Sequence, residues 1–228
     1  MNRILLLGAQ GQVGQELHQL LCDRSDLVSL GRETADFANP ERLRSLVLDT
    51  MPEIIINAAA YTAVDKAEND GELAQTVNAI APQVLAESAH KLGATLIHLS
   101  TDYVFDGKHH SPYLETDATH PLSVYGPTKL AGETAIRTHC DRHLILRTAW
   151  VYGSQGKSNF VKTMLRLGAE REELRVVADQ VGAPTWAAHL AGEIVQLLPQ
   201  LTPDLAGTYH YTNSGVASWY DFATAIFE

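Results

Sequence analysis

The chain has 228 residues, of which 45% are hydrophobic and 19% charged, so it is long enough for an α/β domain with a substantial core and too apolar for a disordered protein. A net charge of −10 argues against a nucleic-acid partner, because phosphate-backbone binding needs a basic surface. The two cysteines, Cys22 and Cys140, offer neither a disulfide framework nor a zinc motif. The absence of a long apolar run and of a signal-peptide pattern predicts a cytoplasmic protein without a membrane partner.

Short apolar runs alternate with helical patterns as far as about Trp150. Continuous apolar strands separated by helices are typical of a parallel sheet covered on both faces, so we expect a doubly wound α/β fold of the Rossmann type. Strands are predicted at Ile4–Leu7, Leu27–Leu30, Ile54–Ile56, Thr95–Leu99 and Leu144–Leu146, and helices at Val13–Leu21, at Pro40–Leu48 and from Leu73 to Leu92.

The pattern loosens in the last third of the chain. Residues 151–228 are expected to form a small C-terminal α/β lobe, interleaved with the domain of residues 1–150. Because the final helical pattern is still running at Glu228, we expect this lobe to be incomplete. Helices are predicted near Asn159–Leu167 and Trp186–Leu198, strands at Leu174–Val177 and Tyr209–Thr212, and a last helix with Ser218 as its N-cap.

Three glycines, Gly8, Gly11 and Gly14, follow the first strand and open the first helix. The first permits a tight turn, the second lets a pyrophosphate approach the backbone, and the third lets helix and strand pack closely. A turn that merely needs positive φ is the alternative. The position after the first strand of an alternating chain favours a dinucleotide-binding domain over residues 1–150.

The end of the second strand bears on the choice of cofactor. An acidic residue there would bind the ribose hydroxyls of NAD, but Gly31 and Arg32 occupy these positions. Because an arginine pairs with a 2′-phosphate, NADPH is the expected cofactor and NADH the alternative. A solvated surface arginine is the other interpretation of Arg32. Asp36 and Phe37 follow, where a carboxylate and a ring could contact the adenine or form an ordinary turn and core.

Tyr125 and Lys129 are four residues apart and therefore share one helical face. An ammonium close to a phenol lowers its pKa, which would make Tyr125 a better general acid. Thr101 ends the fourth strand, where ligands gather in an open α/β sheet. The three residues together suggest hydride transfer to a carbonyl, whereas each alone could be an ordinary helical or strand residue.

Several segments make the chain resemble the extended short-chain dehydrogenase/reductase superfamily and, more narrowly, the dTDP-4-dehydrorhamnose reductase family. The glycine turn and the Tyr-x-x-x-Lys pair specify only the superfamily. Matching segments also include Asn57–Glu68, Ser100–Phe105 and Tyr125–Glu133. The segments most specific to the narrower family are Val64–Glu68, Arg147–Tyr152 and Asp179–Thr185.

The resemblance implies NAD(P)H-dependent reduction of the 4-keto group of a dTDP-linked 6-deoxy-L-sugar, with Thr101, Tyr125 and Lys129 as catalytic residues. A homodimer is a further expectation. Magnesium, which some members bind, is not expected, because Glu16 matches one ligand position but Ala188 occupies another. By this resemblance the substrate would contact Thr101, Asp102 and Trp150, although Trp150 could equally be a core indole. Asn159, which opens a helix of the lobe, could contact the nucleotide or be an ordinary helix start. The residues expected to contact the cofactor are Gly8, Gly11, Gln12, Val13, Gly14, Arg32, Asp36, Phe37, Ala60, Tyr61, Thr62, Leu99, Tyr125 and Lys129.

Two other functions remain open from the sequence. A nucleotide-sugar epimerase or dehydratase would use the same fold with a tightly held NAD, although Tyr103 stands after Asp102 where a dehydratase carries an acidic pair. A non-catalytic cofactor-binding subunit, similar to the methionine adenosyltransferase beta subunit, would resemble the chain as well. The Thr101/Tyr125/Lys129 trio argues against this second alternative.

Overall fold

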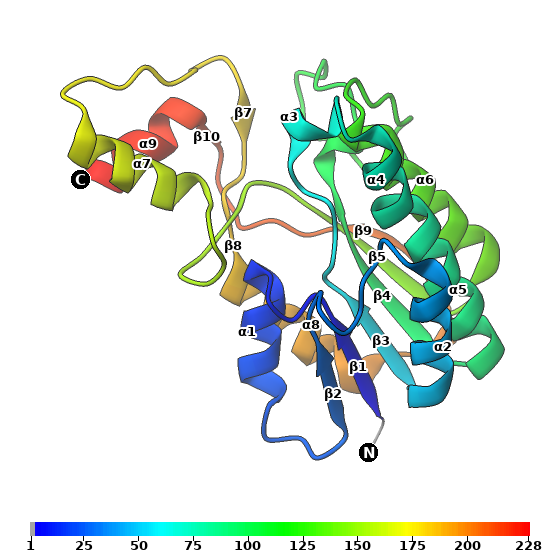
Figure 1. Ribbon diagram of the computed structural model, residues 1–228. Helices are drawn as coiled ribbons and strands as arrows, with labels where there is room; N and C mark the ends of the chain where they lie inside the picture. The colour runs from blue at the N-terminus through cyan, green and yellow to red at the C-terminus, as the bar shows by residue number, and fades with distance from the viewer. Residues whose placement is uncertain (1–2) are drawn as a thin grey trace.

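A six-stranded parallel sheet forms the centre of the molecule in the computed structural model, which describes residues 3–228 (Figure 1). The strand order is β2-β1-β3-β4-β5-β9, and every neighbouring pair is parallel. The expected doubly wound α/β fold is thus confirmed. The strands are β1 (Ile4–Leu7), β2 (Leu27–Leu30), β3 (Ile54–Asn57), β4 (Thr95–Thr101), β5 (His143–Thr148) and β9 (Gly207–His210).

Helices cover both faces of this sheet because successive side chains of a strand point to opposite faces. Leu5 and Leu7 belong to one apolar core cluster, and Ile4 and Leu6 to the other. The second cluster also contains side chains of α1 and α8, and the first contains side chains of α2, α5 and α6. These helices are α1 (Gln12–Leu21), α8 (Ala187–Leu197), α2 (Pro40–Thr50), α5 (Ala81–Leu92) and α6 (Tyr125–His139).

The strand order reverses between β1 and β3, which lie next to each other although β2 comes between them in the chain. At such a switch point the connections leave the sheet in opposite directions, and a crevice opens at the carboxyl ends of the strands. The glycine turn follows β1 at this edge, and the loop that begins at Ala58 follows β3. The topology therefore assigns the ligand site to this edge.

A smaller lobe stands beside the sheet, with helices α7 and α9 at its outer end (Figure 1). Its strands have only two residues each: β7 pairs with β10, and β6 pairs with β8. Both α8 and β9 come from residues 151–228 yet pack with the main body, so the chain passes from one part to the other more than once. The bounds are β6 (Val151–Tyr152), α7 (Phe160–Glu170), β7 (Val181–Gly182), β8 (Thr185–Trp186), β10 (Ala217–Ser218) and α9 (Trp219–Phe227).

Some predicted elements differ from the structure. The strand predicted at Leu174–Val177 is wrong, because this segment pairs with no other strand in the described part of the chain, and the Val177 carbonyl accepts the backbone N–H of Tyr220 instead. The strand predicted at Tyr209–Thr212 runs instead over Gly207–His210. The helix predicted from Leu73 is divided into α4 (Gly71–Gln75), a π-helical turn (Thr76–Ile80) and α5.

Ser218 is the N-cap of α9, as predicted, and forms a reciprocal capping box with Asp221. Within residues 3–228, no helix has the length and apolarity that crossing a membrane requires.

Candidate active site

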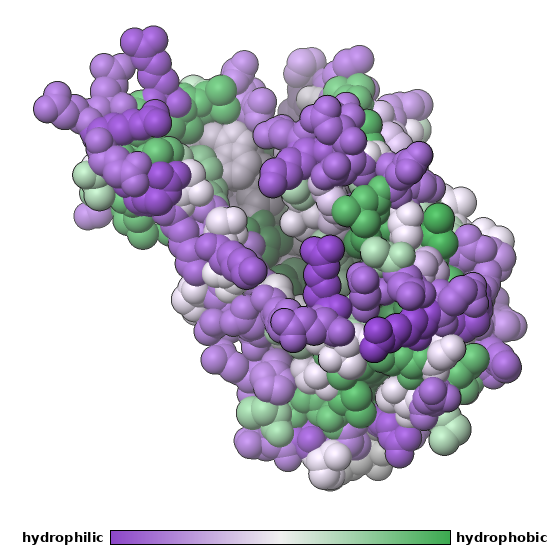
Figure 2. Space-filling model, in the orientation of Figure 1, coloured by the Kyte–Doolittle hydropathy of each residue, from purple (hydrophilic) through white to green (hydrophobic). Residues whose placement is uncertain are grey.

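A cavity of about 740 Å³ lies at the switch point and extends toward the smaller lobe. Figure 2 shows the recess between the lobe and the main body. Its walls come from the glycine turn, the loop after β3, the end of β4, the start of α6 and the segment 148–158. A cavity of this size holds a large organic ligand. Most of the predicted site residues line it, whereas Gly14 and Asn159 do not.

The glycine turn has the geometry of a phosphate cradle. Gly8 has a φ of +78°, and a Cβ added to it would lie 2.6 Å from the backbone nitrogen of Ala59. A Cβ on Gly14 would collide with the carbonyl oxygen of Gly8, so this glycine lets α1 pack against the turn rather than lining the cavity. Gly11 is the N-cap of α1, whose positive dipole end faces the cavity. The cradle fits a dinucleotide pyrophosphate.

The residues predicted for the adenosine end form one side of the same cavity. Arg32 is exposed, so its guanidinium is accessible to a ligand. The carboxylate of Asp36 accepts the backbone N–H of Ala38 at 3.0 Å. The ring of Phe37 lines the cavity but is buried in the core cluster.

The loop after β3 brings Ala60, Tyr61 and Thr62 to the cavity wall. Asn78, in the π-helical turn, holds this loop: its Oδ1 accepts the Tyr61 N–H at 2.8 Å and its Nδ2 donates to the Tyr61 carbonyl at 3.0 Å. The side chain of Tyr61 is fixed by a hydrogen bond to Asp70 at 2.9 Å. These hydrogen bonds hold the cavity wall in place where a cofactor would bind.

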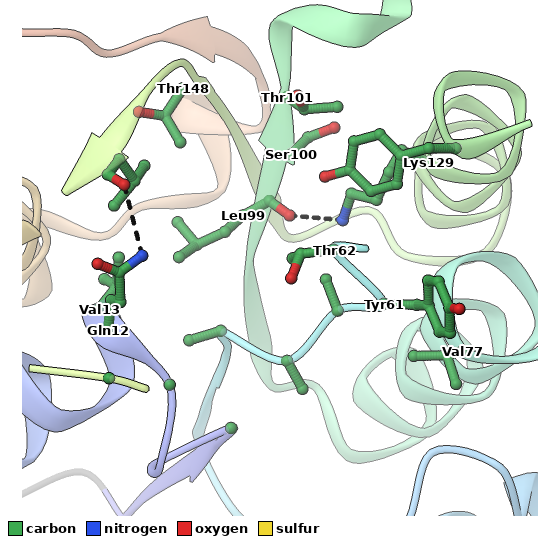
Figure 3. A pocket seen from close by; sticks show the side chains of 18 of the residues that line it. Gln12, Val13, Tyr61, Thr62, Val77, Leu99, Ser100, Thr101, Lys129 and Thr148 are labelled. Atoms are coloured by element: carbon green, nitrogen blue, oxygen red, sulfur yellow. Dashed lines mark hydrogen bonds between the residues drawn. The ribbon is translucent and has the colours of Figure 1, made fainter. Parts of the chain in front are cut away.

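Thr101, Tyr125 and Lys129 all line the cavity and are buried. Thr101 ends β4, Tyr125 begins α6 and Lys129 follows one turn later, so strand and helix converge on one point. Figure 3 shows the Lys129 amine pointing to the carbonyl of Leu99, with Thr101 and Thr62 around the same hollow. The structure brings the predicted trio together.

The prediction that the Lys129 ammonium lowers the pKa of the Tyr125 phenol below its ordinary value is wrong. Burial, followed by the Asp102 and Tyr103 charges, raises the pKa of Tyr125, and the hydrogen bond with Thr101 only partly offsets this. The Lys129 amine is instead engaged by the carbonyl of Leu99 at 2.8 Å and by His98 Nε2 at 3.1 Å. Burial lowers the pKa of Lys129 to about 8, against the attraction of Glu133. A phenol that stays protonated at neutral pH is nevertheless the form that a general acid requires.

The sequence analysis assigned no role to His98 or to the side chain of Asn57, although each is a polar residue that follows apolar residues in its strand. The signal was present, because a histidine in the middle of Thr95–Leu99 has to find a partner when it is buried. The structure supplies that partner as Lys129. Another buried network holds α6: Glu133 accepts from Arg147 at 2.7 and 2.9 Å and from Ser100 at 2.6 Å.

Residues predicted to contact the substrate lie in two environments. Asp102 and Trp150 line the cavity, and burial raises the pKa of Asp102 to about 6. Trp150 has a φ of +48° and stacks on Trp219 of the lobe with ring centroids 3.6 Å apart. The Asn159 side chain instead caps α7 and donates to Gln12 Oε1 at 2.7 Å, which joins the lobe to the glycine turn.

A metal site has no support in the described part of the chain. No group of three or more His, Cys, Asp or Glu side chains in residues 3–228 lies close enough together to hold an ion.

Comparison with known proteins identifies close relatives over the whole chain. The family described as RmlD substrate binding domain matches residues 1–228. dTDP-4-dehydrorhamnose reductase from Escherichia coli is 50% identical over 231 residues, covering 99% of this chain and 77% of the relative. The crystal structure of dTDP-4-dehydrorhamnose reductase from Bacillus anthracis in complex with NADP superposes with a TM-score of 0.92 at 41% identity, over 99% of this chain and 80% of that one. The corresponding Clostridium acetobutylicum structure also gives 0.92 at 41% identity, over 98% and 79%.

Proposed function

This chain belongs to the RmlD substrate binding domain family, and we propose that it reduces dTDP-4-dehydrorhamnose to dTDP-L-rhamnose with NADPH as the reductant. The observation that carries the proposal is a single cavity that joins a dinucleotide-type glycine turn to the buried trio of Thr101, Tyr125 and Lys129. NADH is the alternative reductant. The exposed Arg32 beside the cavity favours the 2′-phosphate of NADPH.

The chain's own side chains supply acid catalysis and positioning. Bound NADPH supplies the hydride. Tyr125 donates its phenolic proton to the oxygen at C4 as negative charge develops there. Thr101 positions that oxygen, and Lys129 is buried in the wall of the same cavity. Trp150, which stacks on Trp219 of the lobe, covers the sugar side, and Asp102 binds sugar hydroxyls. The glycine turn, with Gln12, Val13 and Leu99, holds the cofactor against this group.

We also propose separate roles for the two parts of the chain and an oligomeric state for the protein in solution. Residues 1–150 bind the cofactor, and residues 151–228 provide the substrate lobe, which is supported by the position of Lys157 and Ser158 in the cavity wall. The protein acts in the cytoplasm and forms a homodimer, without nucleic acid as a partner. Sedimentation of the purified protein across a concentration series tests the homodimer.

The function is tested by incubating the protein with dTDP-4-dehydrorhamnose and NADPH while the nicotinamide absorbance is followed. The proposal expects one NADPH consumed for each sugar reduced, and dTDP-rhamnose as the product. Conversion of a nucleotide sugar without net NADPH consumption would indicate an epimerase or dehydratase instead. Tight cofactor binding without any turnover would indicate a regulatory subunit. Comparing the affinities for NADPH and NADH before and after Arg32→Ala tests the role of the arginine.

A further inference from the structure

A chain of buried polar groups leads from the end of β3 to Lys129 in the cavity wall, and its other two members have no part in the proposed mechanism. It consists of Asn57 at the end of β3, His98 within β4 and Lys129 on α6, whose exposed fractions are 0%, 0% and 1%. Polar side chains buried this deeply must satisfy one another, so the direction of each hydrogen bond can be worked out.

The direction is set at one end by the backbone. The N–H of Ala59 can only donate, and it donates to Asn57 Oδ1 at 3.0 Å. The amide nitrogen of Asn57 therefore faces His98 Nδ1 at 2.9 Å, and it too can only donate. Burial and the nearby Lys129 hold the pKa of His98 well below its usual range, so the imidazole is neutral. With Nδ1 accepting, its single proton is on Nε2.

That proton points at the amine of Lys129. His98 Nε2 lies 3.1 Å from Lys129 Nζ, and the carbonyl of Leu99 lies 2.8 Å from the same nitrogen. An ammonium has three donors and no acceptor, so it would oppose the Nε2–H of His98. An uncharged amine accepts from His98 and still donates to Leu99. The polar chain thus matches the uncharged form of Lys129.

We propose that His98, held in one tautomer by Asn57, is a positioning residue that favours release of the proton of Lys129 toward Tyr125. The proposal rests on the proposed function. Tyr125 gives its proton to the sugar oxygen, and the O–H bond lost by the phenol is restored by a proton from the Lys129 ammonium. The resulting amine accepts the Nε2–H of His98 and later takes a proton from water. No electrons move in these steps.

Other groups around Lys129 also influence its charge. On its own helix, Tyr125 lies one turn before it and Glu133 one turn after it, and the Glu133 charge favours the ammonium. Arg147 of β5 is paired with Glu133 and opposes that effect. Asp102 follows β4 at the same end of the sheet, while β3 and the π-helical turn contribute Asn57 and Asn78, which do not titrate.

The tautomer can be measured without substrate by nitrogen NMR of protein carrying labelled histidine. The signal of His98 is assigned by its loss in His98→Gln. The expected result is a proton on Nε2 in the unmodified protein and on Nδ1 in Asn57→Asp, whose carboxylate would accept it. A proton on Nδ1 in the unmodified protein would overturn the proposal even if Asn57→Asp does not fold.

The kinetic test uses the pH profile of kcat. A glutamine side chain in place of the imidazole has a carbonyl that can accept from the ammonium, so His98→Gln should move the alkaline limb upward by about one pH unit. His143→Gln is the matched control, because His143 is also buried in a strand but lies at the opposite end of the sheet. If His98→Gln lowers kcat but leaves the alkaline limb of the pH profile unchanged, His98 has only a structural role and the proposal is refuted. Absence of turnover in the unmodified protein would instead refute the proposed function, and the NMR result would still decide the tautomer.

Discussion

At the scale of single residues, the site works by burying groups that would otherwise be ordinary. The Tyr125 phenol stays protonated because burial disfavours its charged form, while burial makes the Lys129 ammonium more acidic. The two pKa shifts are opposite in sign, but both favour reduction of a ketone. The phenol keeps its proton until charge develops on the sugar oxygen, and the Lys129 ammonium can then supply a proton to the phenolate. The sequence could predict the pair but not these shifts, because they depend on burial.

Replacing Tyr125 by Phe removes the acid and leaves the ring. We expect kcat to fall by about 10²–10⁴-fold, the usual contribution of a general acid, while the Kd of NADPH stays within about two-fold. Stopped-flow turnover and cofactor titration measure the two quantities. Tyr209→Phe is the control, because its hydroxyl bonds only the carbonyl of Leu205 on the surface. Near-normal turnover in Tyr125→Phe would exclude the assignment.

Asp102 predicts a pH-dependent stability. Burial raises its pKa from 3.8 to about 6, so the folded state binds more protons than the unfolded state between these values and stability falls as the pH rises through them. Asp102→Asn removes this penalty. Its free energy of unfolding should exceed that of the unmodified protein by about 2 kcal/mol near neutral pH, after allowance for partial exposure, and by little near pH ~4. Urea titrations at both pH values measure the difference, and a gap that does not grow with pH would contradict it.

At the scale of elements, apolar periodicity was a good guide wherever a strand is buried on both faces. Ile4–Leu7, a fully buried and continuous apolar run that ends at Gly8, was predicted to the residue. Leu27–Leu30 was also predicted to the residue, although it includes Ser29 and is only half-buried. The short strand β7 was missed, since its pairing with β10 depends on how distant segments of the lobe meet. The failed strand at Leu174–Val177 had the right composition but no partner.

The contact between the glycine turn and α1 can be tested with glycines in two helices. Gly14→Ala places a Cβ against the Gly8 carbonyl oxygen, so we expect a loss of about 1–3 kcal/mol in stability and of most cofactor affinity. Gly192→Ala in α8 meets nothing within 4 Å and should instead stabilise the protein by up to about 1 kcal/mol. Thermal unfolding and NADPH titration of both variants are the measurements. Equal stability and equal NADPH affinity in the two variants would mean that the glycine turn can shift to accommodate the added Cβ of Gly14→Ala.

At the scale of the whole molecule, the cavity is made by the main body and the lobe together, and specific side-chain contacts join the two. The Gln12–Asn159 hydrogen bond joins the cofactor turn to the lobe, and Trp150 stacks on Trp219 of α9 across the sugar side. Both contacts join residues far apart in the sequence, which is why Asn159 was predicted as a substrate ligand but is found capping α7. Its contribution to substrate binding remains a prediction.

Trp219→Ala removes the stack that supports Trp150. We expect the KM of the sugar nucleotide to rise by about ten-fold, the equivalent of one strong aromatic pair, with the Kd of NADPH unchanged. Tyr220→Ala is the matched control, since Tyr220 is the next residue of the same helix and its side chain is 54% exposed. Steady-state kinetics at saturating NADPH measure the effect. A parallel loss of cofactor affinity would show that the stack supports the entire fold and not the sugar side.

Hydride transfer to the sugar can be followed with NADPH that carries deuterium at the transferred position. We expect dTDP-4-dehydrorhamnose to yield dTDP-rhamnose with one deuterium at C4, in amounts equal to the NADPH oxidised, and we expect Tyr125→Phe to slow this transfer. A product that carries no deuterium, or one formed without oxidation of the cofactor, would contradict the proposed reduction.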